Sequence, residues 1–336
     1  MDFKRREPHR RNEELEELLS QVNALLWPAE MNAIEEFKAT RYPILLIMGA
    51  PRSGTTLLLQ WISQLGLFSY PTNILSRFYM SPYIGALIQL MLTKHDFNNE
   101  IFDFNQTIPY SSVLGKTKGV LAPNEFWYFW RRFFKFSDIT YLNEEELEKI
   151  DHRTLVSELA AIEYAFGQPF AAKGMMLNWI IPYIDKILEK VLFLYIHRNP
   201  FYNIQSLLEA RVNYYGDERA WYSFKPPEYP QLVDSTPCEQ VAGQIYHTNS
   251  AVERNLAMVH SDRSLHIRYE DFCRFPGKVF EQIGGKLRLQ GYGKQVRYQG
   301  PESFQAAEQV RMAPARVEEV ISSYEKFAGY AISPKL

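Results

Sequence analysis

The sequence predicts an α/β fold of three layers, with a central parallel sheet flanked by helices. Short apolar runs bounded by turn residues occur at 43–49 and 191–198, as is typical of buried strands. Each run precedes a stretch with helical spacing of apolar residues, at 55–65 and 200–211. Strands that alternate with helices form parallel sheets with right-handed crossovers. We expect further strands at 170–173 and 264–272.

Length and composition favour a single globular domain over residues 1–336. The chain is 46% hydrophobic and 23% charged, as in ordinary globular proteins. Helical spacing at 13–27 and 29–38 predicts that residues 1–40 form N-terminal helices. Residues 66–150 are punctuated by prolines and rich in aromatic residues. We expect them to form a mostly helical and looped insert over one end of the sheet, followed by a long helix at 144–166.

Charge and cysteine content exclude several classes of function. A net charge of −2 gives no general attraction to nucleic acid. Cys238 and Cys273 are the only cysteines, and they lack the ligand spacing of a zinc site, so we expect no metal. The sequence has no apolar signal core and no apolar run near the ~20 residues of a membrane span. We therefore expect a cytoplasmic protein without a transmembrane segment; the sequence does not specify its oligomeric state.

A glycine loop, Gly49-Ala-Pro-Arg-Ser-Gly-Thr-Thr56, joins the first strand to the following helix. The free N–H groups and positive dipole at a helix N-terminus bind phosphate, and glycine lets the backbone close around the anion. The two glycines have the spacing of the Walker loop of nucleotide kinases, but Thr55 stands where those enzymes carry lysine. Arg52 supplies positive charge from inside the loop. The alternative is a loop that only turns a strand into a helix.

A second arginine follows the second strong strand. Arg198 ends the run 191–198, Asn199 and Pro200 begin a helix, and Ser206 lies eight residues after the arginine. An arginine at a strand end can bind a phosphate with two hydrogen bonds, and the serine hydroxyl can donate a third. Taken alone, Arg198 would more often be the partner of a surface carboxylate.

These two segments resemble the sulfotransferases that use 3′-phosphoadenosine 5′-phosphosulfate (PAPS), above all bacterial members with a P-loop-like fold. The sequence PRSGTTLL after a buried strand is similar to their 5′-phosphosulfate loop, and the resemblance covers about 40–70 and 170–275. It implies that Arg52 contacts the phosphosulfate and that Ser53, Gly54, Thr55 and Thr56 hold the 5′-phosphate. Arg198 and Ser206 would bind the 3′-phosphate. The implied reaction is direct, in-line, metal-independent transfer of a sulfuryl group to a hydroxyl or amine, which releases 3′,5′-ADP.

The base that accepts the proton of a hydroxyl acceptor is open. Family members use His or Glu at variable positions, but residues 69–78, where tyrosylprotein members carry a Glu, have no carboxylate. The candidates are Glu125, His95 with Asp96, and Asp103.

Glu125 is the candidate that a resemblance supports. The run Pro123-Asn-Glu125-Phe126 resembles a Pro-x-Glu element of some bacterial sulfotransferases. Aromatic neighbours predict a partly apolar pocket, which would raise the pKa of Glu125 toward that of a useful base. Alternatively, Glu125 pairs with Arg131 or Arg132 at the start of a helix.

Lys173 ends the predicted strand at 170–173, and its position resembles that of a lysine in sulfotransferases. The implied role is charge stabilisation of the sulfuryl group or of the leaving oxygen; the alternative is a surface lysine at a strand end. Two other functions compete: a P-loop nucleotide kinase, and a nucleotide-binding homologue without catalytic activity. Aromatic residues at 97–136 and 221–229 suit a small-molecule, glycan or lipid acceptor.

Overall fold

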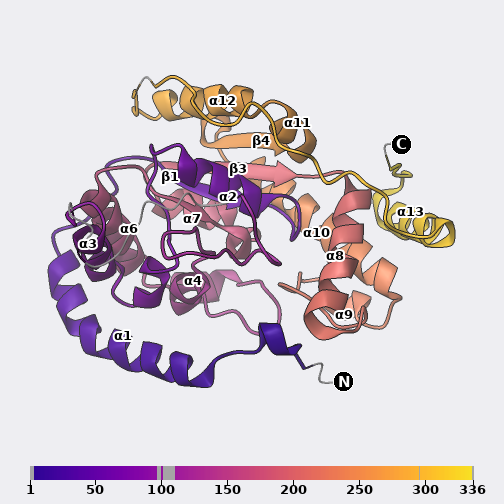
Figure 1. The fold of residues 1–336 in the computed structure, drawn as a ribbon, viewed down its shortest axis with the longest axis horizontal. Coiled ribbons are helices and arrows are strands. Elements are labelled where there is room, and N and C mark those ends of the chain that lie inside the picture. The colour runs from indigo at the N-terminus through magenta and orange to yellow at the C-terminus, as the bar shows by residue number, and fades with distance from the viewer. Residues whose placement is uncertain (1–3, 97–99, 101–109, 295, 335–336) are drawn as a thin grey trace.

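The computed structural model describes residues 4–96, 100, 110–294 and 296–334. Its centre is a parallel sheet of the strands β1 (Ile44–Met48), β2 (Ala171–Lys173), β3 (Val191–His197) and β4 (Ser264–Arg268), in the order β2-β1-β3-β4. Helices cover both faces of the sheet (Figure 1). The expected α/β fold with a central parallel sheet is confirmed.

The remaining elements are helices. In chain order they are η1 (Glu7–His9), α1 (Glu13–Ile34), α2 (Thr55–Gln64), η2 (Leu75–Phe78), α3 (Pro82–Leu92), α4 (Trp127–Phe133), α5 (Glu144–Glu148), α6 (His152–Phe166), η3 (Met175–Leu177), α7 (Ile181–Ile187), α8 (Pro200–Tyr215), α9 (Tyr229–Leu232), α10 (Pro237–Leu256), η4 (Ser261–Arg263), α11 (Tyr269–Arg274), α12 (Pro276–Leu289) and α13 (Pro314–Ala328). Within the part of the chain that the structure describes, no helix is long and apolar enough to cross a membrane.

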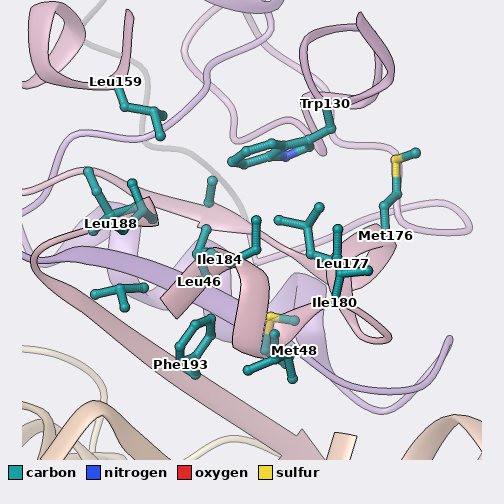
Figure 2. Packing of buried hydrophobic residues seen from close by; sticks show 14 of the residues in the cluster. Leu46, Met48, Trp130, Leu159, Met176, Leu177, Ile180, Ile184, Leu188 and Phe193 are labelled. Atoms are coloured by element: carbon teal, nitrogen blue, oxygen red, sulfur yellow. The ribbon is translucent and has the colours of Figure 1, made fainter. Parts of the chain in front are cut away.

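The continuous apolar sequence of β1 follows from burial on both faces. Alternate side chains of a strand point to opposite faces. Leu46 and Met48 join a cluster on one face that includes Trp130 of α4 and Phe193 of β3 (Figure 2). Leu45 and Ile47 join a second cluster, on the other face, with α2 and α11. The sheet is therefore a rigid base for the loops that leave its carboxyl ends.

Three expected elements have different bounds. The helices expected at 13–27 and 29–38 are one helix, α1, which continues through Pro28. Tertiary contacts favour this continuation, because Glu30 accepts hydrogen bonds from the backbone N–H groups of Tyr83 and Ile84 at the start of α3. The helix expected at 144–166 is divided into α5 and α6, since Asp151 caps α6 by accepting from the Thr154 N–H.

The strand expected at 264–272 ends at Arg268, and Tyr269 begins α11. The insert expected at 66–150 contains η2, α3, α4 and α5 among its described residues, joined by loops. Segments of this insert line a cleft that also contains residues from the carboxyl ends of β1 and β2.

Candidate active site

The loop 49–56 leaves β1 and enters α2 with three residues in the left-handed region. Gly49 and Gly54 have φ of 144° and 105°, and Arg52 has φ of 67°. A Cβ at Gly49 would lie 2.4 Å from the carbonyl oxygen of Ile196, and one at Gly54 would lie 2.4 Å from the Tyr269 ring. Neither glycine can be replaced without moving its neighbour. The strained Arg52 backbone is typical of a functional loop.

Two buried asparagines fix the loop from outside. Asn178 accepts from the Gly49 N–H at 3.2 Å and donates to the Gly49 carbonyl at 3.0 Å. Asn203, on α8, donates to the carbonyl of Pro51 at 2.6 Å. The backbone is therefore preorganised before any ligand binds, as an anion-binding loop requires.

The hydroxyls of the loop have different partners. Ser53 is fully buried, and its hydroxyl has no hydrogen-bond partner among the described residues. Thr55 donates to the sulfur of Met175 at 3.3 Å, and the Thr56 hydroxyl accepts from Lys173 at 2.7 Å. A buried donor without a partner is costly, so the Ser53 hydroxyl fits an anion held by this loop.

The loop after β3 brings a second arginine to the same place. Arg198 is 6% exposed, and its Nη1 donates to the Arg52 carbonyl at 3.4 Å. Arg52 in turn donates through Nε to the Ser206 hydroxyl at 3.2 Å. Thus Arg52, Arg198 and Ser206, which the sequence assigned to two phosphate positions, form one polar group.

The Arg198 guanidinium is partly engaged. Its Nη2 donates to the carbonyl of Ala307, and it lies over the Tyr269 ring at 4.8 Å. Within the described chain, its buried Nε has no hydrogen-bond partner. An anion next to the Arg198 guanidinium would therefore meet a donor that the protein itself leaves unsatisfied.

Lys173 and Glu125 form an ion pair beside the loop. The Lys173 ammonium lies 2.7 Å from Glu125 Oε1 and 2.7 Å from the Thr56 hydroxyl, and the Lys173 side chain is 4% exposed. Lys173 is therefore not a surface lysine. Glu125 is 31% exposed and accepts from the indole of Trp127. It pairs with Lys173 and not with Arg131 or Arg132.

The expectation of a raised pKa for Glu125 is wrong. Burial raises the pKa of this carboxyl, but the charge and hydrogen bond of Lys173 oppose that effect, as do the Trp127 indole and the charge of Arg52. The net result is a pKa below the ordinary glutamate value. The aromatic neighbours were visible in the sequence, whereas the lysine, 48 residues away along the chain, was not. The lowered pKa favours the ionised carboxylate, which is the form of Glu125 that can accept a proton.

The rival bases lie elsewhere. His95 and Asp96 follow α3, and neither lines the cleft that contains Glu125 and Lys173. The His95 side chain is exposed. Asp103 lies outside the described residues.

A cleft of about 1490 Å³ is lined by Arg52, Gly54, Thr55 and Thr56 of the loop and by Glu125, Lys173, Arg198 and Ser206, whereas the buried Ser53 does not line it. Its walls come from the N-terminal segment, the insert, and the loops after β1, β2 and β3. Ligand pockets usually measure about 300–1000 Å³, so this cleft has room for two substrates. Among the residues that the structure describes, no group of three or more His, Cys, Asp or Glu side chains could hold a metal ion.

Several of these contacts have no signal in the sequence. Asn178 and Asn203 are ordinary polar residues in the sequence, and their role follows only from the placement of η3 and α8 beside the loop. The Tyr269 ring lies against both Gly54 and Arg198. Arg211, further along α8, is fully buried and donates to Gln240 at 2.7 Å.

The chain is similar to known proteins in its sequence pattern and in its fold. A model of the Sulfotransferase family matches residues 43–292. Sulfotransferase STF9 from Mycobacterium avium is similar in structure, with 13% sequence identity, a TM-score of 0.50, and coverage of 93% of this chain and 82% of that chain. Sulfotransferase STF1 from Mycobacterium tuberculosis shows 12% identity, the same coverage and a TM-score of 0.47. No curated protein sequence matches the chain.

Proposed function

Because the chain belongs to the sulfotransferase family, we propose that it transfers the sulfuryl group of PAPS directly to a hydroxyl or amine acceptor. One observation carries the proposal: a single buried ammonium, Lys173 Nζ, contacts both the phosphate loop at Thr56 and the carboxylate of Glu125. The Lys173 ammonium lies between a loop that would bind the anionic donor and a carboxylate that would act as the base. A cation at that position can stabilise the negative charge of a group that passes from donor to acceptor.

The donor would lie across the loops after β1 and β3. The backbone N–H groups at the start of α2, with Ser53, Gly54, Thr55 and Thr56, would hold the 5′-phosphate. Arg198 and Ser206 would bind the 3′-phosphate, and Arg52, which already contacts Ser206, would face the phosphosulfate. The unsatisfied Ser53 hydroxyl and Arg198 Nε support this placement.

The transfer would then proceed in one step. The acceptor oxygen attacks sulfur, Glu125 takes the acceptor proton, and the bond between sulfur and the bridging phosphate oxygen breaks. The electron pair of that bond leaves with 3′,5′-ADP. Lys173 and Arg52 would stabilise the negative charge that develops on the bridging oxygen and the sulfuryl oxygens.

The first test is nucleotide binding. We expect 3′,5′-ADP to bind with micromolar or tighter affinity, unchanged by EDTA, because two arginines and the loop donors supply the contacts. Isothermal titration calorimetry measures this affinity, with ATP and magnesium as the control for a nucleotide kinase. Binding of ATP that requires magnesium, without binding of 3′,5′-ADP, would support the kinase instead. Binding of 3′,5′-ADP without transfer from labelled PAPS to any acceptor would indicate a homologue that has lost catalysis.

The 3′-phosphate site gives a second prediction. Arg198→Ala should weaken 3′,5′-ADP binding by about 2–4 kcal/mol, because it removes a charge-assisted contact to phosphate. Ser206→Ala should cost about 1 kcal/mol, the value of a neutral donor. Both should reduce the preference for 3′,5′-ADP over AMP, which lacks the 3′-phosphate, and calorimetry with the two nucleotides measures that preference. An unchanged preference in both variants contradicts the assignment.

A further inference from the structure

The cleft that contains Glu125 also carries an excess of positive charge away from the phosphate loops. Six cationic side chains line it there, contributed by the N-terminal segment, η2, the loop at 112–120 and α4: Arg5, Arg10, Arg11, Arg77, Lys116 and Arg131. Among the described residues, none of the six pairs with a carboxylate. In the same cleft, by contrast, Lys225 pairs with Asp138 at 2.7 Å.

Of the other carboxylates on the described cleft wall, Glu125 pairs with Lys173 and Glu209 with Arg311. Glu16 accepts from the Tyr128 hydroxyl at 2.5 and 2.6 Å. The cations raise the local potential enough to act on a neighbour. His9 stacks on Tyr214 at 4.7 Å, and its pKa is lowered, first by burial and then by the charges of Lys116, Arg6 and Arg5. The six cationic side chains therefore make this wall of the cleft positively charged.

The positive wall is close to the reacting groups. A Cβ on Gly115, the neighbour of Lys116, would lie 3.1 Å from Glu125 Oε1. Arg131 is on α4, which begins two residues after Glu125. The N-terminal segment crosses from α1 to the end of α8, where the Arg6 N–H donates to the Tyr214 carbonyl at 2.9 Å (Figure 1). At Gly115 and α4, therefore, the positive wall reaches the neighbourhood of Glu125.

Aromatic side chains also line the cleft. Trp127, Tyr128, Phe136 and Tyr215 line the same cleft, and Tyr128 is 41% exposed. Aromatic rings offer flat apolar faces on which sugar rings can stack, and arginines bind carboxylates and sulfates. The cations line a concave cleft, so a flat bilayer would reach only those at its rim.

We propose that the acceptor is a soluble acidic oligosaccharide whose anionic groups bind the six cations while one of its hydroxyls faces Glu125. This inference rests on the proposed sulfuryl transfer, because it names the acceptor for that reaction. Each exposed pair of a protein cation and an anionic group of the oligosaccharide is weak alone, but several pairs together give measurable affinity. Salt screens these charges and therefore reduces that affinity.

The test uses labelled hexagalacturonate, which is acidic, and labelled maltohexaose, which is neutral. Fluorescence anisotropy measures their binding to the full chain, with and without saturating 3′,5′-ADP. We expect hexagalacturonate to bind at least about tenfold more tightly at low salt. The double variants Arg10→Ala/Arg11→Ala and Arg77→Ala/Arg131→Ala should each weaken it about tenfold. The matched control, Lys149→Ala/Arg153→Ala, removes two exposed cations that do not line the cleft and should change nothing.

Equal binding of the two oligosaccharides, or an equal loss in the control variant, overturns the proposal. So does binding to anionic phosphatidylserine vesicles that depends on Arg10 and Arg11 while hexagalacturonate binding does not. The affinity for 3′,5′-ADP, measured in the same samples, should be unchanged in every variant, which also reports that each variant is folded. If 3′,5′-ADP fails to bind the parent protein, the proposed sulfuryl transfer fails, and the oligosaccharide measurements without nucleotide still decide whether the six cations bind an acidic oligosaccharide.

Discussion

Replacement of Glu125 by Gln should reduce the rate of sulfuryl transfer by about 10²–10⁴-fold, the usual contribution of a general base. The amide keeps the shape of the carboxylate and can still accept from Trp127, but it cannot take a proton. Affinity for 3′,5′-ADP should change little, because the arginines of the two phosphate sites remain. Single-turnover transfer from labelled PAPS to acceptors of graded acidity measures the effect. A more acidic acceptor should recover part of the lost rate, since it needs less help to ionise.

Two variants serve as controls. Asp138→Asn removes another lysine-paired carboxylate of the same cleft and should leave transfer unchanged. His95→Ala tests the rival base, which lies outside the cleft lining. A Glu125→Gln protein with parental rates, next to an inactive His95→Ala protein, would assign the base to His95. Arg52→Ala should also slow transfer, but acidic acceptors should not rescue it, because the arginine stabilises charge on the donor.

The sheet could be predicted because its two central strands, β1 and β3, are short, apolar and buried on both faces. The run 44–48 has no polar residue, so a strand buried on both faces suits it better than any other element does. Helix bounds were harder, because local signals compete with tertiary contacts. Pro28 normally breaks a helix, yet the packing of Glu30 against the start of α3 keeps α1 continuous.

The candidate site, like the fold, has one part that the sequence predicts and another that depends on tertiary contacts. The loop at 49–56 and the pair Arg198 and Ser206 have local signatures, and the structure brings Arg52, Arg198 and Ser206 together. The partner of Glu125 has no such signature, because Lys173 reaches it only through the register of β2 beside β1. The sequence therefore predicted a raised pKa for Glu125 from its aromatic neighbours, while the distant lysine reverses the sign.

Lys173→Met should affect both the rate and its dependence on pH. The rate at neutral pH should fall by about 10²–10³-fold, the usual effect of losing a group that stabilises transition-state charge. In the parent, the pKa of Glu125 lies below the ordinary value, and the carboxylate must be ionised to act. Activity is therefore lost only as the pH falls through that lowered pKa. Without the Lys173 ammonium, burial still raises the pKa of Glu125 while its largest opposing effect is gone.

The acidic limb of the kcat/KM profile should accordingly move to higher pH in Lys173→Met. A pH profile of transfer, recorded from below to above the ordinary glutamate pKa, measures this shift. Lys225→Met is the matched control, since it removes the partner of Asp138 from the same cleft and should leave the acidic limb in place. In the double variant with Glu125→Gln the limb should disappear, because no carboxylate remains to titrate. An acidic limb that stays at the parental pH in Lys173→Met would contradict the prediction. It would mean that Lys173 does not set the pKa of the titrating base, either because that base is not Glu125 or because Lys173 has a merely structural role.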